Sequence, residues 1–212
     1  MRGGAVRSIF VDLDCTLIDS ERRYEDEKRV AESFGVPRAI YEWAVDELYK
    51  RYEVGSYSFP LLCEIIRPRM LNFPEELHLR LASLLSCNYF FSDALDFLAE
   101  FSQEELVLVT SGNQEFQQKK IQTHQLAKYF GRIFVARNKA QVIGEEKAGT
   151  DFFIDDAPRE IEKVKLAHPD IFCVQVRTPA SWESQKTTAF ADAHLPDLAA
   201  AAEYIKRKTA LG

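Results

Sequence analysis

The sequence has little of what disulfide frameworks and zinc sites are made of. Its 212 residues include only four cysteines and four histidines, which are scattered along the chain and form no C-x-x-C pair. Widely spaced cysteines of this kind are typical of reduced thiols, so we expect a cytoplasmic protein without a structural disulfide. The cysteines are Cys15, Cys63, Cys87 and Cys173.

Long hydrophobic runs and an excess of basic charge are also missing. No apolar stretch approaches the roughly 18 residues that a membrane-spanning helix requires. Segment 1–7 is too short for a signal peptide, and the strand after it soon meets acid. With 33 acidic and 27 basic side chains the formal net charge is −6, which argues against a nucleic-acid partner. We therefore expect a monomer or homodimer that binds neither membranes nor nucleic acids.

What is present is an ordinary globular composition, 46% hydrophobic and 28% charged, together with a repeated strand–helix pattern. Five short segments rich in Val, Ile, Leu or Phe predict strands, and helices are expected at 114–129 and 158–168. The gap 137–150 is expected to be irregular. This alternation predicts an α/β protein with a Rossmann-like, doubly wound parallel sheet. The strand segments are 8–13, 106–110, 133–136, 151–155 and 171–176.

The gap after the first strand segment is different, because it is far too long for a loop inside a compact domain. Apolar residues recur there at helical spacing, as at Ile40 and Ala44. We therefore expect residues 19–88 to form a helical cap. It would be inserted between the two parts of an α/β core, 1–18 and 89–212.

The first strand segment ends in two carboxylates, Asp12 and Asp14, followed by Thr16. The apolar run before them predicts a fully buried strand, and burying a carboxylate without compensation costs several kcal/mol. Two like charges this close usually share a cation or a proton. In open α/β sheets, ligands bind at the carboxyl ends of the strands. The alternative interpretation is a strand followed by an acidic turn, since D-x-D is a common tripeptide.

A second acid pair, Asp155 and Asp156, ends another apolar strand segment. With Asp12 and Asp14 it places up to four carboxylates on one edge of the predicted sheet. Their mutual repulsion would destabilise the cluster without a bound cation. Oxygen ligands without His or Cys favour a hard ion such as Mg²⁺.

Two further features point to an anionic ligand. The second strand segment ends in T-S-G-N, beginning at Thr110, which suits a phosphate-binding helix start or an ordinary Ser/Thr helix cap. Two lysines follow the third strand segment. Lys139 comes directly after it and could reach the same edge of the sheet as a point charge. Lys147 is the competing candidate, in a Gly-flanked segment that is typical of an exposed turn.

These four motifs, in this order, resemble those of the haloacid dehalogenase-like hydrolases, and the helical segment resembles that family's C1-type cap. In the core the likeness covers most of residues 5–16 and 90–208. In the family a short helical stretch separates the lysine from the last acid pair, and this spacing favours Lys139 over Lys147. Cys15 stands where the family usually has glycine. We expect this difference to be tolerated, with the thiol either packed and inert or sensitive to oxidation.

The resemblance implies a role for each motif residue. Asp12 would be the nucleophile that forms an aspartyl-phosphate, and Asp14 would act as general acid and then general base. Thr110, Ser111 and Lys139 would bind the phosphoryl oxygens. Thr16 would orient the loop.

The implied cofactor is Mg²⁺, which would offset the repulsion between an anionic nucleophile and an anionic substrate. The implied ligands are Asp12, the backbone carbonyl of Asp14, Asp155, and Asp156 directly or through water. The function that follows is Mg²⁺-dependent hydrolysis of a small phosphorylated metabolite, a phosphomonoester.

Other functions of the same fold stay open: phosphonatase, phosphomutase, dehalogenase, or a non-catalytic binding protein. A dehalogenase attacks carbon and needs neither a metal nor a second acid, so Asp14 favours phosphoryl chemistry. A phosphonatase would need a lysine from the cap, where Lys28 and Lys50 lie. A binding protein would be expected to lack Asp12, Asp14 or Asp155, and all three are present.

The resemblance does not identify the substrate, because caps in this family determine specificity without a transferable code. Residues 21–24 (Glu-Arg-Arg-Tyr) follow the first motif closely. They either face the cleft or form a solvated helix face. Arg51, Arg67 and Arg69 are further candidates to bind a second anionic group of the substrate.

Overall fold

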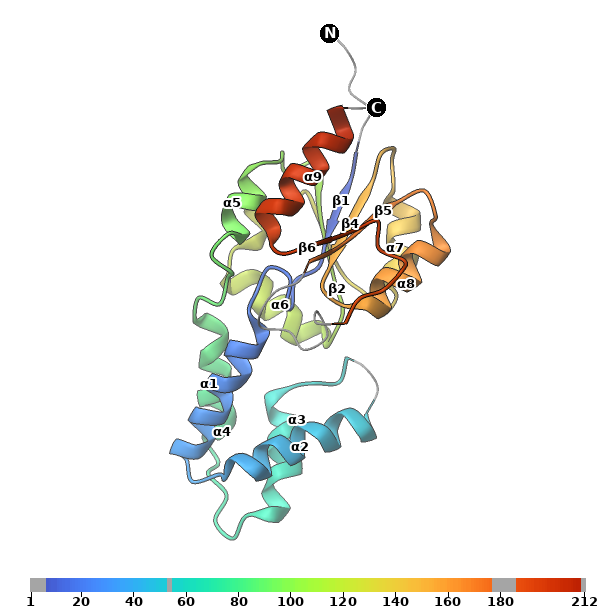
Figure 1. Cartoon of the computed structure of the whole chain (residues 1–212). Coiled ribbons are helices and arrows are strands. Elements are labelled where there is room, and N and C mark those ends of the chain that lie inside the picture. Colours follow the sequence, from blue (N-terminus) through green and yellow to red (C-terminus); the bar gives the residue numbers. More distant parts are fainter. Residues whose placement is uncertain (1–6, 53–54, 177–185, 211–212) are drawn as a thin grey trace.

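The computed structural model describes residues 7–52, 55–176 and 186–210. Within these ranges the core is one six-stranded sheet in the order β3-β2-β1-β4-β5-β6 (Figure 1). All neighbouring strands are parallel, so the predicted α/β class and doubly wound sheet are confirmed. The strands are β1 (Ile9–Val11), β2 (Leu106–Thr110), β3 (Arg132–Val135), β4 (Phe152–Asp155), β5 (Phe172–Val176) and β6 (Ala193–Leu195).

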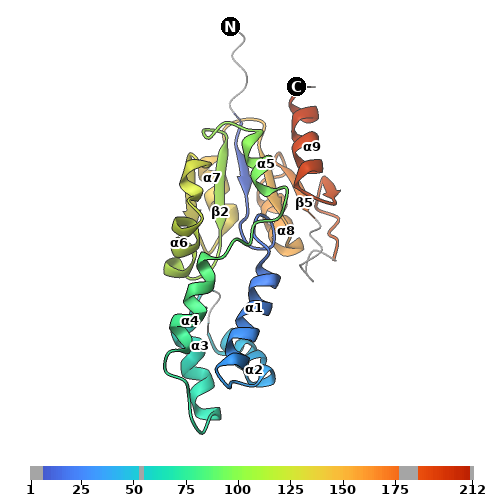
Figure 2. The ribbon, with the colours of Figure 1, turned by 90° about the vertical axis from the view of Figure 1, so that its left-hand side faces the viewer.

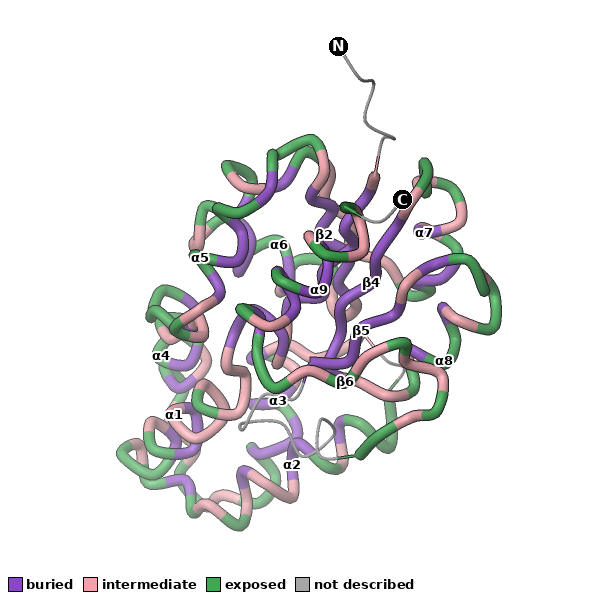
Figure 3. Tube along the Cα trace, turned by 45° about the horizontal axis from the view of Figure 1, so that its top comes forward, coloured by how far each residue is buried: buried purple, intermediate pink, exposed green. Residues whose placement is uncertain are grey.

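Helices cover both faces of the sheet, which explains why the central strands read as continuous apolar runs. In β1, Ile9 and Val11 pack into the cluster on one face and Phe10 into the cluster on the other. Figure 3 shows the central strands as buried. One face carries α5 (Ala94–Ala99), α6 (Gln114–Thr123) and α9 (Leu198–Ala210), and the other carries α7 (Lys139–Glu146) and α8 (Pro158–Ala167).

A helical insert follows β1, as predicted (Figure 2), and it packs around an apolar cluster of its own. Its first helix begins where the Asp19 side chain accepts a hydrogen bond from the Arg22 backbone N–H at 2.8 Å, as helix-capping residues do. The insert comprises α1 (Ser20–Ser33), α2 (Arg38–Arg51), α3 (Phe59–Ile66), η1 (Arg67–Arg69), α4 (Leu77–Ser83) and η2 (Leu84–Ser86).

The two connections between the core and the helical insert lie side by side. The Asp19 N–H donates to the Tyr89 carbonyl at 2.7 Å, and the Phe91 N–H donates to the Leu17 carbonyl at 3.0 Å. This pairing holds the insert against the carboxyl ends of the strands, as Figure 1 shows. The residues that follow β1 and β4 therefore face the insert.

Two local expectations were wrong or incomplete. The segment 137–150, expected to be irregular, contains α7, which begins after Asn138 accepts from the Gln141 N–H at 3.3 Å. Ala140 and Ile143 are the buried apolar residues of that helix. The short edge strand β6 was not predicted. None of the helices in the described residues is long and apolar enough to span a membrane.

Candidate active site

Three buried carboxylates meet at the carboxyl ends of β1 and β4. These strands are neighbours with Val11 opposite Ile154, so the residues that follow, Asp12 and Asp155, also lie side by side. One oxygen each of Asp12, Asp155 and Asp156 lies within 4.8 Å of the others. The sheet order reverses at β1, and this is the crevice where ligands of doubly wound folds bind.

The cluster lies around the ammonium group of Lys139. Lys139 Nζ donates to Asp12 Oδ1 at 2.6 Å and to Asp155 Oδ2 at 2.7 Å, and its side chain is only 3% exposed. Although burial favours the neutral amine, the two carboxylates raise the pKa of Lys139. Lys147, in contrast, is one-third exposed and pairs with Asp170 at the surface. Of the two candidate lysines, the structure brings only Lys139 to the acid cluster.

The charges of this cluster fit a divalent cation. Three carboxylates and one ammonium leave a net charge of −2 when all are ionised. Burial raises the pKa of Asp12 to about 7, and the neighbouring Asp155 adds to that rise while Lys139 opposes it. A further cation would keep Asp12 ionised, and clustered carboxylate oxygens are what Mg²⁺ prefers. The residues present therefore fit a bound Mg²⁺.

The side chain of Asp14 is not part of that cluster. Lys120 Nζ donates to both of its oxygens, at 2.6 and 2.7 Å. Gln117 Nε2 donates to Asp14 Oδ2 at 2.8 Å, and the Ser20 hydroxyl donates to Oδ1. Burial by itself would raise the pKa of Asp14, but Lys120 and Arg23 hold it well below its usual range. The expected contact of its backbone carbonyl with Mg²⁺ stays a prediction.

The T-S-G-N motif begins at the last residue of β2 and ends at the cap of α6. Asn113 caps the helix by accepting from the Phe116 N–H at 3.0 Å, so the capping residue is this asparagine and not the Ser/Thr of the alternative interpretation. Thr110 is buried, and its Oγ1 has no hydrogen-bond partner among the residues that the structure describes. A buried hydroxyl without a partner indicates a group that awaits a ligand or water.

Gly112 and Cys15 both occupy the left-handed backbone region. Gly112 has φ +141°, and a Cβ there would lie 2.8 Å from Gln117 Nε2. Cys15 has φ 59°, which explains why glycine suits this position. Burial, together with the charge of Asp156, raises the pKa of the Cys15 thiol. This favours the packed, inert thiol over the oxidation-sensitive one. Thr16 accepts from the Asp156 N–H at 3.1 Å, which ties the loop after β1 to the loop after β4.

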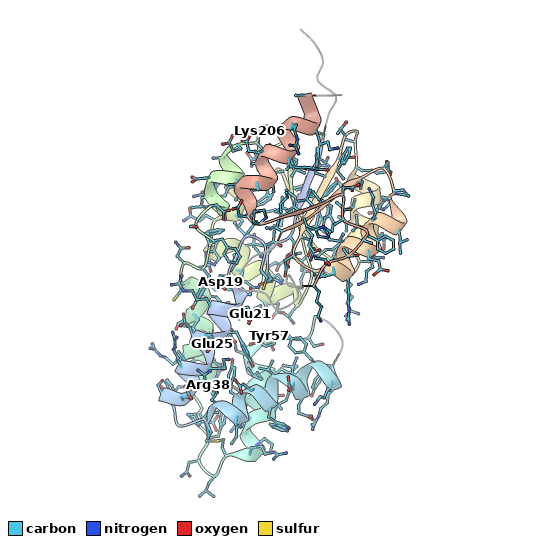
Figure 4. The ribbon with its side chains drawn as sticks, in the orientation of Figure 1. Asp19, Glu21, Glu25, Arg38, Tyr57 and Lys206 are labelled. Carbon is cyan, nitrogen blue, oxygen red and sulfur yellow. The ribbon has the colours of Figure 1, made fainter. Side chains whose placement is uncertain are left out.

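Of residues 21–24, three line a cavity of about 740 Å³ that Arg159 of the core also lines: Glu21, Arg23 and Tyr24. In Figure 4 the labelled Glu21 lies on α1 near the core. Arg22 instead lies over the ring of Tyr89.

The other candidates in the helical insert have partners away from the acid cluster. Arg67 pairs with Glu75, Arg51 with Glu47, and Arg69 lies over Trp43. The two lysines considered for phosphonatase chemistry behave in the same way. Lys28 pairs with Glu25 and Glu42, and Lys50 pairs with Glu47.

Sequence reasoning missed Lys120 and Gln117, although both contact Asp14. They lie three residues apart and hence on one face of α6, and both are buried. From the sequence alone, both residues would be assigned to the solvent-exposed face of a helix. Only the placement of α6 beside the loop after β1 brings them to Asp14.

Solved structures of the same fold match almost the whole chain. A protein from Burkholderia xenovorans LB400, described as a haloacid dehalogenase-like hydrolase, matches with a TM-score of 0.77 and 21% identity, over 98% of this chain and 100% of that one. The HAD-hydrolase YfnB from Bacillus subtilis, whose structure contains magnesium, matches with a TM-score of 0.67 and 16% identity, over 95% and 99%.

An L-2-haloacid dehalogenase from Xanthobacter autotrophicus also matches, with a TM-score of 0.65 and 12% identity, over 95% of this chain and 98% of that one. No protein-family model and no curated protein sequence match the chain. The protein thus has the fold of the haloacid dehalogenase-like hydrolases, and the resemblance stated from its motifs is confirmed at the level of fold.

Proposed function

We propose that the protein is a haloacid dehalogenase-like hydrolase that cleaves phosphomonoesters with the help of Mg²⁺ and uses Asp12 as its nucleophile. The observation that carries this proposal is the buried cluster of Asp12, Asp155 and Asp156 around Lys139. A cluster with these charges suits a dianionic phosphoryl group bound together with a divalent cation.

In the first half of the reaction, an oxygen of Asp12 attacks phosphorus while the bond from phosphorus to the leaving oxygen breaks. Lys139, already 2.6 Å from Asp12, offsets charge on the phosphoryl oxygens, and the hydroxyl of Thr110 is available to donate to one of them. Mg²⁺, held by Asp12, Asp155 and Asp156, would supply further positive charge for the spreading negative charge of the transition state.

In the second half, water attacks phosphorus, and the bond to Asp12 breaks to release inorganic phosphate. Lys120 keeps Asp14 ionised and therefore free of a proton, so Asp14 can accept the proton of this water, although its lowered pKa makes it a weaker base. A poor leaving group needs one proton in the first half of the reaction. Because Asp14 is ionised, that proton comes from the Lys120 ammonium by way of Asp14, and the attacking water returns it in the second half. A positioned acid or base of this kind contributes about 10²–10⁴-fold to rate.

Dehalogenation is the competing proposal, because L-2-haloacid dehalogenases share this fold. It requires attack on carbon and makes no use of a divalent cation. The cluster of Asp12, Asp155 and Asp156 would then keep an excess of buried negative charge that Lys139 alone does not offset, and such an excess is costly. This argument favours phosphoryl transfer.

The experiment is a direct comparison of the two substrates. Purified protein is assayed with p-nitrophenyl phosphate and with 2-chloropropionate, each with Mg²⁺ and with EDTA. We expect hydrolysis of the phosphate ester with Mg²⁺, loss with EDTA, recovery on adding Mg²⁺, and weak support by Ca²⁺ because of its looser coordination. Chloride release that is unaffected by EDTA, without phosphate release, would establish the dehalogenase instead.

A further inference from the structure

A second cavity, of about 270 Å³, lies between the core and the helical insert beside Asp14. Gly55 of the insert closes one side. A Cβ on Gly55 would lie 3.1 Å from the Gly112 carbonyl oxygen, so the two backbones are in close contact there. The cavity is lined by Asp14, Ser20, Arg23, Tyr49, Gly55, Tyr57, Ser111, Gly112, Asn113, Phe116, Gln117 and Lys120. In the proposed reaction Asp14 faces the leaving group, so this cavity is where the leaving group lies.

Arg23, which lines this cavity, carries a buried hydrogen-bond donor that is unused. Its side chain is only 11% exposed, and it pairs through Nη1 with the fully buried Glu27. Glu27 is held in turn by the hydroxyls of Tyr41, at 3.0 Å, and Tyr57, at 2.8 Å. The Nε–H of Arg23 has no partner in the described part of the chain. A buried N–H without a partner destabilises the folded protein, so a ligand that accepts its hydrogen bond is favoured.

Tyr57 places the network of Arg23 and Glu27 at the boundary between the helical insert and the core. Figure 4 places the labelled Tyr57 where the helical insert meets the core. Its ring contacts Phe116 of α6 edge to face, with 5.2 Å between centroids. The guanidinium of Arg23 and the ammonium of Lys120 also approach the Phe116 ring, at 5.5 and 5.2 Å. The donor on Arg23 is therefore held by side chains of both the insert and the core.

Gln117, which lines the same cavity, carries a buried acceptor that is unused. Its Nε2 donates to Asp14 Oδ2 and to the Ser111 carbonyl, both at 2.8 Å. These two bonds fix which end of the amide is the nitrogen, because both of those partners only accept. Its Oε1 is buried and has no partner among the described residues.

The charges around the cavity favour a neutral group. Glu27 neutralises Arg23, and Asp14 neutralises Lys120, so neither cation requires an anionic ligand. What is missing is one acceptor for the Arg23 N–H and one donor for the Gln117 oxygen. An alcohol hydroxyl can supply both, since it donates one hydrogen bond and accepts others.

We propose that this cavity is the leaving-group site and that it selects phosphate esters of small, neutral, hydroxyl-bearing alcohols, with Arg23 and Gln117 binding a leaving-group hydroxyl. The inference rests on the proposed phosphomonoester hydrolysis. A site built to bind a hydroxyl discriminates strongly against an analogue that lacks it, because its own polar groups then stay unpaired.

The test compares two esters with the same three-carbon chain, glycerol 1-phosphate and n-propyl phosphate. We expect kcat/KM to favour the glycerol ester by about 100-fold or more. Phosphoglycolate, which carries a carboxylate in place of hydroxyls, tests the charge argument and should be a poorer substrate than the glycerol ester. p-Nitrophenyl phosphate with Mg²⁺ serves as the reference for turnover.

The decisive variant is Arg23→Lys. It keeps a cation for Glu27 and so protects the fold, but it removes the Nε–H. The preference for the glycerol ester over the propyl ester should fall at least about tenfold, as expected for the loss of a hydrogen bond from a charged donor. The double variant Arg23→Met/Glu27→Gln, which leaves no lone buried charge, should show the same fall. Arg22→Met is the matched control, because Arg22 lies over Tyr89 outside the cavity, and it should keep the preference.

The possible failures can be told apart. Turnover of p-nitrophenyl phosphate with equal kcat/KM values for the glycerol and propyl esters, or with a preference for phosphoglycolate, would overturn the leaving-group proposal and leave the proposed function standing. An unchanged preference in Arg23→Lys would overturn the role of Arg23. If none of the phosphate esters is hydrolysed with Mg²⁺, the proposed function itself fails.

Discussion

Lys120 holds both carboxylate oxygens of Asp14, with its Nζ 2.6 and 2.7 Å from them. The lysine comes from α6, the helix that follows the T-S-G-N motif, and it is 2% exposed. The residue proposed as acid and base is thus fixed in place by the helix beside it. This pair links the proposed phosphate-binding turn to the leaving-group cavity, because both residues line that cavity.

Lys120→Met should lower kcat by about 10²-fold or more while changing KM little, since the variant loses the positioning of Asp14 and not the binding of phosphate. Steady-state kinetics with p-nitrophenyl phosphate measure both parameters. Lys119→Met is the matched control, because Lys119 is the neighbouring residue on the same helix and is exposed; its kinetics should stay close to wild type. A large loss in the control, or none in Lys120→Met, would contradict the role of the pair.

Acid should weaken the folded state in part through Asp14. Lys120 and Arg23 lower its pKa in the folded state, against the effect of burial. A carboxyl with a depressed folded-state pKa contributes stability that is present above its unfolded pKa, about 3.9, and is lost as the pH falls toward the folded pKa. The difference in free energy of unfolding between wild type and Asp14→Asn should therefore shrink as the pH is lowered from about 5 to about 2. Urea unfolding at several pH values measures it, and a constant difference would be the contrary result.

The sequence predicts the core of this site well and its surroundings poorly. Apolar runs that end in acid locate β1 and β4, and the parallel order then brings Asp12 and Asp155 together. Lys139 was expected at this edge because it follows the third strand segment and because the family's spacing favours it; its Nζ contacts Asp12 and Asp155, and its role in binding phosphate stays a prediction. These features depend on the local residue pattern, which can be read directly from the sequence, and on the right-handed crossovers of parallel strands, which are a general rule.

Contacts that depend on how a helix is rotated were not predictable. Gln117 and Lys120 have no motif of their own, and only the seating of α6 against Asp14 and the helical insert makes them part of the site. The residue pattern alone did not predict the helix α7, because Gly144 weakens that pattern, whereas the resemblance implied a short helix between Lys139 and the last acid pair. That glycine has a packing reason, since a Cβ there would lie 2.7 Å from the ring of His168.

Lys139→Ala should cost far more activity than Lys147→Ala. Removing a cation that is buried against Asp12 and Asp155 should raise the activation free energy by about 2–5 kcal/mol. Lys147 pairs with Asp170 at the surface, and its loss should matter within about 0.5 kcal/mol. The values of kcat/KM for the two variants decide the point. A larger loss for Lys147→Ala would reverse the assignment.

Replacing Cys15 with glycine should give a more stable protein than replacing it with alanine. At φ 59° a residue with a side chain is strained and glycine is not. Cys15→Gly should therefore be about 0.5–1 kcal/mol more stable than Cys15→Ala. This difference already allows for the greater backbone entropy that glycine loses on folding. Both variants remove the thiol, so the comparison isolates the backbone. Chemical denaturation measures the difference, and an alanine variant as stable as the glycine one would argue against strain at this turn.

The central claim is that Asp12 becomes phosphorylated during turnover, and trapping that species tests it most directly. Asp14→Asn, in which water is poorly activated, is mixed with p-nitrophenyl phosphate and Mg²⁺, quenched in acid and digested for mass spectrometry. We predict a burst of about one p-nitrophenol per enzyme and one added phosphoryl group on the peptide that contains Asp12. The double variant Asp12→Asn/Asp14→Asn should give neither. A burst without a modified peptide, or a phosphoryl group on another residue, would contradict the account.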